Sequence, residues 1–520
     1  MKKKIIIKGY KKETERVVSY IPFRYIVAIF LVVLETLAVI GVMTLLTIFI
    51  PYFYFAVVAT QVGVAVAIVN RKDNPDYKLP WLFFVLLIPI VGFMLYFMFY
   101  SRKLGKKQSK RLNGLTKQRV MKDDTESLLE VHAENELVGS QAVMLGTLSD
   151  SHLYGNTDIR YYPLGETLFA AMVKDLKCAE KFIFMEYFII EGGLFWDTIL
   201  EVLKEKAASG VEVRVVYDDI GCMMTLPGNY YKQLRKFGIK AVPFSRLRGQ
   251  ANNEFNNRSH RKITVIDGRV GFTGGVNLAD EYINRVEKFG HWKDVGLRLE
   301  GEAVNELTRL FLIDYGLNDK NANDYFADYY AYEQYEQEGY CIPFGDGPKP
   351  VYQRQVSKAV ILNMLNQAKR YVYITTPYLI IDSELIEALE NTAMRGVDVR
   401  IITPHVPDKK LVFLMTRSHY NRLLAAGVKI YEYESGFVHA KTYLSDDETV
   451  MVGTVNMDYR SLVHHFENGV WIYKHKVLED IKRDFLDTQE KSVKFELGML
   501  KENLFQRFIR ALAKVFSPLF

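Results

Sequence analysis

Residues 259–268, S-H-R-K-I-T-V-I-D-G, carry a pattern that the chain repeats in residues 438–446, V-H-A-K-T-Y-L-S-D. The shared pattern is His-x-Lys-x4-Asp, formed by His260, Lys262 and Asp267 in the first copy and by His439, Lys441 and Asp446 in the second. The apolar and β-branched residues after each histidine predict strands. Side chains at i and i+2 of a strand point to one face, so each histidine should lie beside its lysine. An imidazole beside an ammonium group suits an anionic ligand.

The residues that follow each copy repeat as well. They are Gly274, Gly275 and Asn277 after the first copy, and Gly453, Thr454 and Asn456 after the second. Small residues let the backbone approach a ligand closely, and an asparagine amide can donate a hydrogen bond to a phosphate oxygen. A single His-x-Lys on a strand is commonly only a solvated face. Two copies with matching downstream residues favour a function over coincidence.

These residue types support phosphoryl transfer through a covalent intermediate. One neutral histidine can attack phosphorus while the other, protonated, donates to the leaving alkoxide. Two lysines can stabilise the charge on the non-bridging oxygens. This chemistry requires no cofactor. The three cysteines, Cys178, Cys222 and Cys341, show neither a disulfide framework nor a zinc-ligand spacing.

An internal repeat surrounds the motifs. Residues 181–190 and 210–218 read as strand, helix, strand, and residues 370–381 and 396–404 read the same way. Gly210 and Gly396 stand where each helix should end, as C-caps. This alternation predicts an α/β fold of two lobes with largely buried sheets. The two motifs should meet across a pseudo-twofold interface between the lobes.

The chain resembles the phospholipase D superfamily and, more closely, the bacterial cardiolipin synthases. The resemblance covers nearly the whole chain and rests on residues 256–282 (N-N-R-S-H-R-K-I-T-V-I-D-G-R-V-G-F-T-G-G-V-N-L-A-D-E-Y), 453–461 (G-T-V-N-M-D-Y-R-S), 87–96 (L-I-P-I-V-G-F-M-L-Y) and 516–520 (F-S-P-L-F). It implies two phospholipase D-like α/β sandwich lobes preceded by an N-terminal helical membrane region. The implied reaction condenses two phosphatidylglycerol molecules to cardiolipin and glycerol through a phosphohistidine.

The resemblance also implies roles for single residues. His260 would be the nucleophile and His439 the general acid, although the residues themselves do not distinguish the two. Asp294 in H-W-K-D and Glu467 in F-E-N-G match acids that orient the histidines, and surface carboxylates are the alternative. Asp267 and Asp446, although part of the motif, are expected to brace the lobes. Candidates for phosphate contacts are Asn277, Asn456, Arg460 and Ser461.

Three alternatives share parts of this pattern. A phospholipase D, or a transferase using another alcohol, would have the same site and a different acceptor. A membrane-anchored nuclease would need a basic, aromatic-lined groove, and no such run stands near either motif. A scaffold without activity is disfavoured by the intact histidines and lysines.

The N-terminal region predicts a membrane anchor. Residues 25–69 are almost uninterruptedly apolar, which is enough for two spans joined near Pro51, because one span needs roughly 20 residues. Residues 80–100 are a third candidate. Basic residues precede Tyr25 and follow Tyr100, which favours anionic lipid over nucleic acid as partner and places both flanks, with the lobes, in the cytoplasm. Three full spans would contradict this placement, so one element should not cross; Pro89 and Gly92 could bend the last one into a re-entrant segment.

We expect a multi-pass protein of the cell membrane, organised in seven parts. They are a basic tail (1–24), membrane helices (25–100), a basic linker (101–135), the first lobe (136–320), an inter-lobe linker (321–345), the second lobe (346–490) and a C-terminal amphipathic segment (491–520). A net charge of +6 and 49% hydrophobic residues fit this division.

Overall fold

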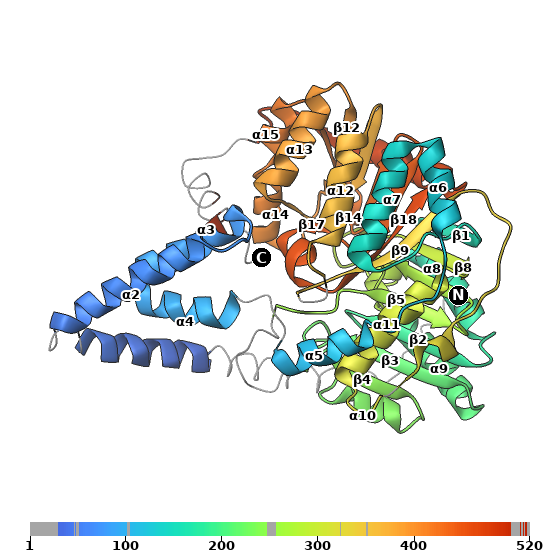
Figure 1. Cartoon of the computed structure of the whole chain (residues 1–520), viewed down its shortest axis with the longest axis horizontal. Coiled ribbons are helices and arrows are strands. Elements are labelled where there is room, and N and C mark those ends of the chain that lie inside the picture. Colours follow the sequence, from blue (N-terminus) through green and yellow to red (C-terminus); the bar gives the residue numbers. More distant parts are fainter. Residues whose placement is uncertain are drawn as a thin grey trace, which may run out of the picture.

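The structure, a computed structural model, describes residues 30–45, 47, 51–100, 105–246, 256–322, 324–349, 352–500, 510, 513 and 515–516. The basic tail expected for residues 1–24 lies outside the described residues, as does most of the C-terminal segment. Within them, two α/β lobes stack on each other and a group of helices projects from one side (Figure 1).

The first lobe is built on a seven-stranded sheet of order β1-β8-β6-β5-β2-β3-β4. Its strands are β1 (Thr157–Tyr162), β2 (Phe182–Tyr187), β3 (Glu212–Asp218), β4 (Lys240–Phe244), β5 (Lys262–Ile266), β6 (Val270–Gly274) and β8 (Gly296–Gly301). Helices α8 (Gly165–Leu176), α9 (Leu194–Ala208) and α10 (Tyr230–Arg235) pack with it, and α11 (Val304–Asn318) follows β8. Every residue of β2 is buried, as expected for a strand covered on both faces.

The second lobe repeats this plan on an eight-stranded sheet of order β19-β13-β12-β10-β15-β16-β18-β9. Its strands are β9 (Tyr340–Asp346), β10 (Tyr371–Thr375), β12 (Asp398–Pro404), β13 (Lys429–Tyr433), β15 (Thr442–Ser445), β16 (Thr449–Gly453), β18 (Glu467–Tyr473) and β19 (Ser492–Phe495). Its helices are α12 (Val356–Gln367), α13 (Ser383–Met394), α14 (Lys410–Arg417), α15 (Tyr420–Ala425) and α16 (Val477–Glu490). Read from β9 to β13, the order matches the first sheet from β1 to β4. This confirms the predicted repeat.

Local sequence explains how the repeat is built. The C-cap prediction is confirmed, because Gly210 and Gly396 have φ of 93° and 90° after α9 and α13. The central strands keep one pattern: β2 pairs parallel with β3 and antiparallel with β5, and β10 pairs in the same way with β12 and β15. The strands that carry the two motifs therefore occupy equivalent central positions.

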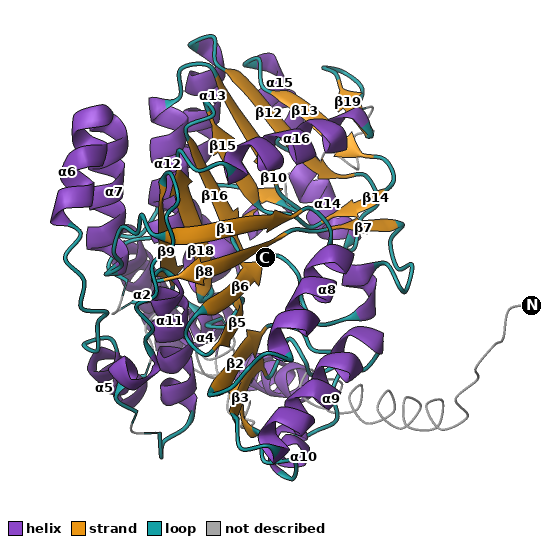
Figure 2. Cartoon of the chain, turned by 90° about the vertical axis from the view of Figure 1, so that its right-hand side faces the viewer, coloured by secondary structure: helices purple, strands orange, loops and turns teal. Residues whose placement is uncertain are grey.

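The lobes share a hydrophobic core. One buried cluster joins Leu310 and Phe311 of α11 to Ile481 and Phe485 of α16, together with side chains from both sheets. Two short parallel pairings also cross between the lobes. Strand β7 (His291–Lys293) pairs with β14 (Gly436–Val438), and Ser259 bridges to Phe466. Figure 2 shows the two sheets lying one above the other.

Helices α6 (Thr125–Glu134) and α7 (Glu136–Ser149) lie on the second lobe, although they precede the first in sequence. Val138, Ala142 and Leu145 belong to the buried cluster that contains Val360 and Met364 of α12. The residues of α7, which were expected to open the first lobe, therefore pack on the second lobe. The reason is hydrophobic: the apolar side of α7 packs on α12 and β9.

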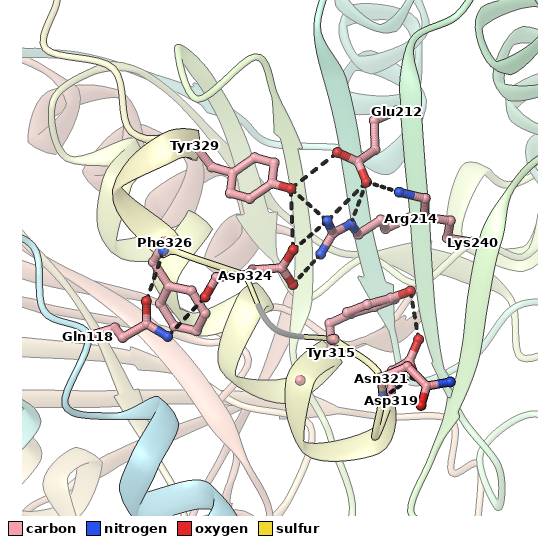
Figure 3. Close-up of polar contacts among 12 residues, drawn as sticks. Gln118, Glu212, Arg214, Lys240, Tyr315, Asp319, Asn321, Asp324, Phe326 and Tyr329 are labelled. Carbon is pink, nitrogen blue, oxygen red and sulfur yellow. Dashed lines mark hydrogen bonds and ion pairs between the residues drawn. The ribbon is translucent and has the colours of Figure 1, made fainter.

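The segment between the lobes is fastened to the first lobe (Figure 3). Arg214 of β3 forms an ion pair with Asp324, with Nη1 2.8 Å from Oδ2. Tyr329, at the end of the short helical turn η3 (Phe326–Tyr329), receives a hydrogen bond of 2.6 Å from Arg214 and donates to Glu212 at 3.2 Å. The predicted linker ends in β9, whose strand runs from Tyr340 into the second sheet.

The basic linker also packs on the body of the protein. In α5 (Lys106–Leu115), Leu115 contacts the first-lobe core, and the Arg111 guanidinium donates to the carbonyl oxygens of Gly316 and Asp319 at the end of α11. Arg111, one of the basic residues that follow Tyr100, thus caps the end of α11.

The projecting helices comprise Phe30–Leu45, α2 (Pro51–Val69), α3 (Pro75–Leu87) and α4 (Pro89–Phe99). Among the described residues, Tyr52–Val69 is the one helix long and apolar enough to cross a membrane, and 6% of it is buried. The candidate span at 80–100 is not one helix, because the chain breaks at Ile88 and turns back. The turn brings Tyr100 to the start of α3, where its hydroxyl donates to Asp73 at 2.7 Å. Residues 80–100 are therefore bent, as Pro89 and Gly92 suggested.

Candidate active site

The two motif histidines lie at equivalent places, just before the central strands β5 and β15. The backbone N–H of His260 donates to the carbonyl of Phe466 at 2.8 Å, and that of His439 donates to the carbonyl of Lys293 at 2.7 Å. Both bonds cross between the lobes. Each carbonyl belongs to the residue immediately before a candidate acid. These backbone contacts therefore position each acid beside a histidine.

The acids and histidines pair across the lobe boundary. His260 Nδ1 lies 3.0 Å from Glu467 Oε2, and His439 Nδ1 lies 2.6 Å from Asp294 Oδ2. Both carboxylates are fully buried. Each acid follows one motif in sequence and contacts the histidine of the other motif. The surface-carboxylate alternative is therefore wrong for Asp294 and Glu467.

The two lysines are buried beside the histidines, as the strand spacing predicts. Lys262 Nζ donates to the carbonyl of His260 at 2.7 Å, whereas Lys441 Nζ lies 2.8 Å from His439 Nδ1. Burial lowers the pKa of Lys262 to about 7 and that of Lys441 to about 8. The positive charge of Lys441 also lowers the pKa of Lys262, and the positive charge of Lys262 lowers the pKa of His439. The two half-sites thus lie within electrostatic reach of each other.

The two histidine–carboxylate pairs differ electrostatically. Burial lowers the pKa of His260 to about 3 against the opposing effect of Glu467, and burial together with Lys441 lowers that of His439 well below its ordinary value. Burial raises the pKa of Asp294 to about 6. Burial would also raise that of Glu467, but its interactions with His260 and His465 hold it well below the usual range. Glu467 is therefore the more firmly ionised of the two acids.

The two acids also accept hydrogen bonds from different groups. Thr454 Oγ1 and Ser461 Oγ both donate to the Glu467 carboxylate. Asp294 instead accepts the backbone N–H of Val295 at 2.8 Å. Gly275 is required beside it, since a Cβ at this position would lie 2.0 Å from Asp294 Oδ1.

The two motif aspartates stand outside this cluster. Asp267 accepts the backbone N–H groups of Glu180, Lys181 and Phe182 at 2.7–2.8 Å. Asp446 accepts those of Lys369, Arg370 and Tyr371 at 2.7–2.8 Å. Both occupy the left-handed region, with φ of 53° and 58°, which aspartate tolerates. Each aspartate therefore holds a loop of its own lobe, the loop that leads into β2 or into β10, and not a contact between the lobes.

The candidate phosphate contacts are engaged within the protein or exposed. The Asn277 amide donates to Tyr282 at 2.7 Å, and that of Asn456 donates to Asp458 at 3.0 Å. Ser461 supports Glu467, as described above. The side chain of Arg460 is exposed at the start of the helical turn η4 (Arg460–His464).

Several residues of the site were missed by the sequence reasoning. His465 lies beside Glu467, with Nδ1 3.7 Å from Oε1. Arg261, between His260 and Lys262, points to the opposite face of the strand, where it pairs with Asp314 at 2.9 Å and donates to the Glu467 carbonyl at 3.1 Å. An arginine directly before the apolar buried strand β5 was a signal of such a partner.

Comparisons with known proteins agree with this geometry. The family model described as "Cardiolipin synthase, PLD-like domain" matches residues 172–294 and 361–488, one match in each lobe, and "Phospholipase_D-nuclease N-terminal" matches residues 61–99. The chain is 34% identical over 474 residues to cardiolipin synthase 2 of Bacillus anthracis, covering 89% of this chain and 90% of the relative. It is 33% identical over 464 residues to a cardiolipin synthase of Staphylococcus aureus strain Mu50, covering 84% and 90%.

Two further matches add to this comparison. An uncharacterized protein of Streptococcus mutans is 42% identical over 465 residues, which cover 88% of this chain and 100% of that protein. The crystal structure of phosphatidylserine synthase from Haemophilus influenzae matches with a TM-score of 0.56 at 16% identity, covering 74% of this chain and 98% of that one. At this identity the second match supports the two-lobed fold alone.

Proposed function

Because the chain belongs to the cardiolipin synthase family of phospholipase D-like proteins, we propose that it transfers the phosphatidyl group of one phosphatidylglycerol to the headgroup hydroxyl of another. The products are cardiolipin and glycerol. The observation that carries the proposal is the pair of histidine–carboxylate contacts across the lobe boundary, with a buried lysine beside each histidine. Two imidazoles held in this way can share one phosphoryl transfer.

The reaction has two steps in this site. His260 Nε2 attacks phosphorus while Glu467 holds Nδ1; a P–N bond forms, the bond to the glycerol oxygen breaks, and His439 donates a proton to that oxygen. His439 then removes the proton of the second lipid's hydroxyl, whose oxygen attacks phosphorus and releases His260. One phosphodiester replaces another, so no nucleotide is consumed. Lys262 and Lys441 stabilise the charge on the non-bridging oxygens.

The difference between the half-sites supports His260 as nucleophile. A carboxylate that accepts Nδ1–H makes the opposite ring nitrogen more basic, and Glu467 is the more firmly ionised acid. His439 instead has the Lys441 ammonium 2.8 Å from its Nδ1. This charge disfavours a further proton on His439 until an anionic phosphodiester enters and offsets it.

We further propose that the lobes lie on the cytoplasmic face of a membrane crossed twice. At 1.5 Å per residue, α3 and α4 are roughly 20 Å and 16 Å long, too short for a hydrocarbon core of about 30 Å. Together they form a re-entrant hairpin, packed closely because Gly92 faces the Phe84 backbone, where a Cβ would lie 2.3 Å from the carbonyl oxygen. Gln61 of α2 donates to the carbonyls of Val85 and Leu86 at the tip of this hairpin. Two spans and one hairpin leave both basic flanks on one side, which removes the conflict with three spans.

The corner between α2 and α3 also joins the membrane region to the second lobe. Asn74 Nδ2 donates to Asp382 Oδ2 at 2.8 Å, and the backbone N–H of Ser383 donates to Asp76 at 2.6 Å. The ring of Tyr77 lies 5.4 Å from that of His464, one residue before His465. Phosphatidylglycerol in the bilayer would therefore have a short path to the site.

Mass spectrometry of lipids formed by the purified chain in phosphatidylglycerol vesicles tests the function. We expect cardiolipin and glycerol from the unaltered protein and none from His260→Ala or His439→Ala. Phosphatidic acid as the main product would favour the hydrolase alternative, and a new phosphatidyl product on adding another alcohol would favour a different acceptor. Normal cardiolipin formation by either variant would refute the two-histidine mechanism.

Cysteine labelling tests the topology. In a Cys178→Ser background, which removes the one exposed cysteine of the described residues, Lys72→Cys and Gly105→Cys place a thiol on each flank of the hairpin. We expect an impermeant maleimide to reach both from the cytoplasmic side only. Labelling from opposite sides would mean that the segment crosses.

A further inference from the structure

We propose that His260, His465 and Glu467 form a reversible binding site for a divalent transition-metal ion such as Zn²⁺, and that occupation of this site stops phosphoryl transfer. The binding part stands on geometry alone, and the inhibition rests on the proposed function. The sequence shows no zinc-ligand spacing because the three ligands come from both lobes and meet only in the folded chain.

The donor atoms are spaced as metal ligands. One nitrogen or oxygen from each of the three residues lies within 4.8 Å of the others. The Nδ1 atoms of both histidines face the same carboxylate oxygen, Glu467 Oε1, at 3.0 Å for His260 and 3.7 Å for His465. Tetrahedral zinc with bonds of about 2.0–2.1 Å separates neighbouring ligands by roughly 3.4 Å. Small side-chain movements would therefore close the three groups around one ion.

The donor set and its burial favour zinc over calcium or magnesium. Two imidazoles and one carboxylate suit a borderline-soft ion and leave a fourth position open. The three side chains are 8%, 11% and 0% exposed for His260, His465 and Glu467. His465 Nδ1 is buried without a hydrogen-bond partner among the described residues, so a ligand position there is available.

Neighbouring charges make the site reversible. Lys262 stands close enough for its charge to act on His260, and it opposes a dication. Asp458, which His465 influences electrostatically, partly offsets this repulsion. A resident structural zinc would have no such cation beside it, so we expect an ion that binds and leaves with its free concentration.

Occupation would disable the proposed nucleophile. A metal on His260 Nδ1 replaces the Nδ1–H that faces Glu467, and it withdraws electron density from the ring. The Glu467 carboxylate is used as a ligand and no longer orients the imidazole. Cardiolipin formation should fall, and a chelator should restore it.

Zn²⁺ binding to the purified, chelator-washed full chain tests the site by calorimetry, with three proteins compared. They are the unaltered chain, His465→Asn and the matched control His405→Asn. His405 Nδ1 lies 2.9 Å from Glu432, so the control disrupts a histidine–glutamate pair that has no second imidazole. We expect one high-affinity Zn²⁺ per chain, weakened at least tenfold in His465→Asn and unchanged in His405→Asn. Equal affinity in the unaltered chain and His465→Asn would overturn the site.

Inhibition is measured separately in the vesicle assay, each variant relative to its own metal-free rate. We expect Zn²⁺ to inhibit the unaltered chain and His405→Asn at the same concentration. His465→Asn should need at least a tenfold higher Zn²⁺ concentration for the same inhibition. His465→Gln with unchanged thermal unfolding serves if His465→Asn folds poorly. Binding without inhibition would overturn the inhibitory role. Binding in a chain that forms no cardiolipin would refute the proposed function and leave the metal site standing.

Discussion

His260 Nδ1 lies 3.0 Å from Glu467 Oε2, although 207 positions separate the two residues in the chain. The counterpart contact joins His439 to Asp294 across 145 positions. Each half of the site therefore combines a histidine from one lobe with an acid from the other. Each motif histidine thus takes its carboxylate partner from the other lobe, so the proposed catalysis depends on the interface between them.

Glu467→Gln and Asp294→Asn should each lower the rate of cardiolipin formation by roughly 10²–10⁴-fold, because each removes the charge that orients one imidazole. The two variants should differ in the step that they slow. Glu467→Gln should form little phosphohistidine, whereas Asp294→Asn should be rescued in part by a substrate with a more acidic leaving alcohol. Rapid-quench detection of the phosphoenzyme measures this difference, and identical behaviour of the two variants would contradict the assigned roles.

The rate should depend on pH in a bell shape. Asp294 has its pKa raised to about 6 by burial, so it gains a proton and loses its hold on His439 as the pH falls through that value. Burial lowers the pKa of Lys262 to about 7 and that of Lys441 to about 8, so their ammonium charges are lost as the pH rises through these values. Initial rates in vesicles of fixed composition and ionic strength measure both limbs. The residual activity of Asp294→Asn should lack the acid limb, and an unchanged limb would assign it elsewhere.

Asp446→Ala should destabilise the fold more than it alters the chemistry. The change leaves three backbone N–H groups without their carboxylate, a loss of at least about 1.5–3 kcal/mol, the scale of one hydrogen bond to a charged group. Thermal unfolding should occur at a lower temperature, while the rate per folded molecule stays near normal. Asp446→Asn, whose single amide oxygen can still accept the N–H groups of Arg370 and Tyr371 and which tolerates the left-handed turn, should lose less. A folded, stable and inactive Asp446→Ala would instead indicate a catalytic part.

Tyr77→Ala should lower turnover although Tyr77 does not belong to the site. Its ring holds His464, and the same turn carries Ser461, which donates to Glu467. We expect a several-fold lower kcat at saturating phosphatidylglycerol, with Tyr77→Phe close to the unaltered chain because the ring contact remains. Leu79→Ala, an exposed position on the same helix, is the control. Equal turnover of Tyr77→Ala and Leu79→Ala would show that the corner only anchors the chain.

Much of this organisation was readable from the order of residues. The doubled His-x-Lys motif, the strand–helix–strand repeat and the glycines after α9 and α13 predicted two related lobes, and the resemblance to cardiolipin synthases is confirmed. These features are local, because strand alternation and helix caps depend on near neighbours. The shape of the membrane segment could be predicted from the sequence only in part. Pro89 and Gly92 suggested a bend, but the close contact of α3 with α4 showed that the segment turns back.

The sequence by itself determined the chemical groups, the strands that carry them and the repetition of both. Only the tertiary structure decided the partners: Glu467 with His260, Asp294 with His439, and His465 as a third imidazole beside the same carboxylate. It also separated the motif aspartates, Asp267 and Asp446, from the site by placing them at the far ends of the strands. The physical reason is that these contacts depend on how two buried sheets pack across an interface. Side chains more than a hundred positions apart meet there through the shared core of α11 and α16, which no local pattern records.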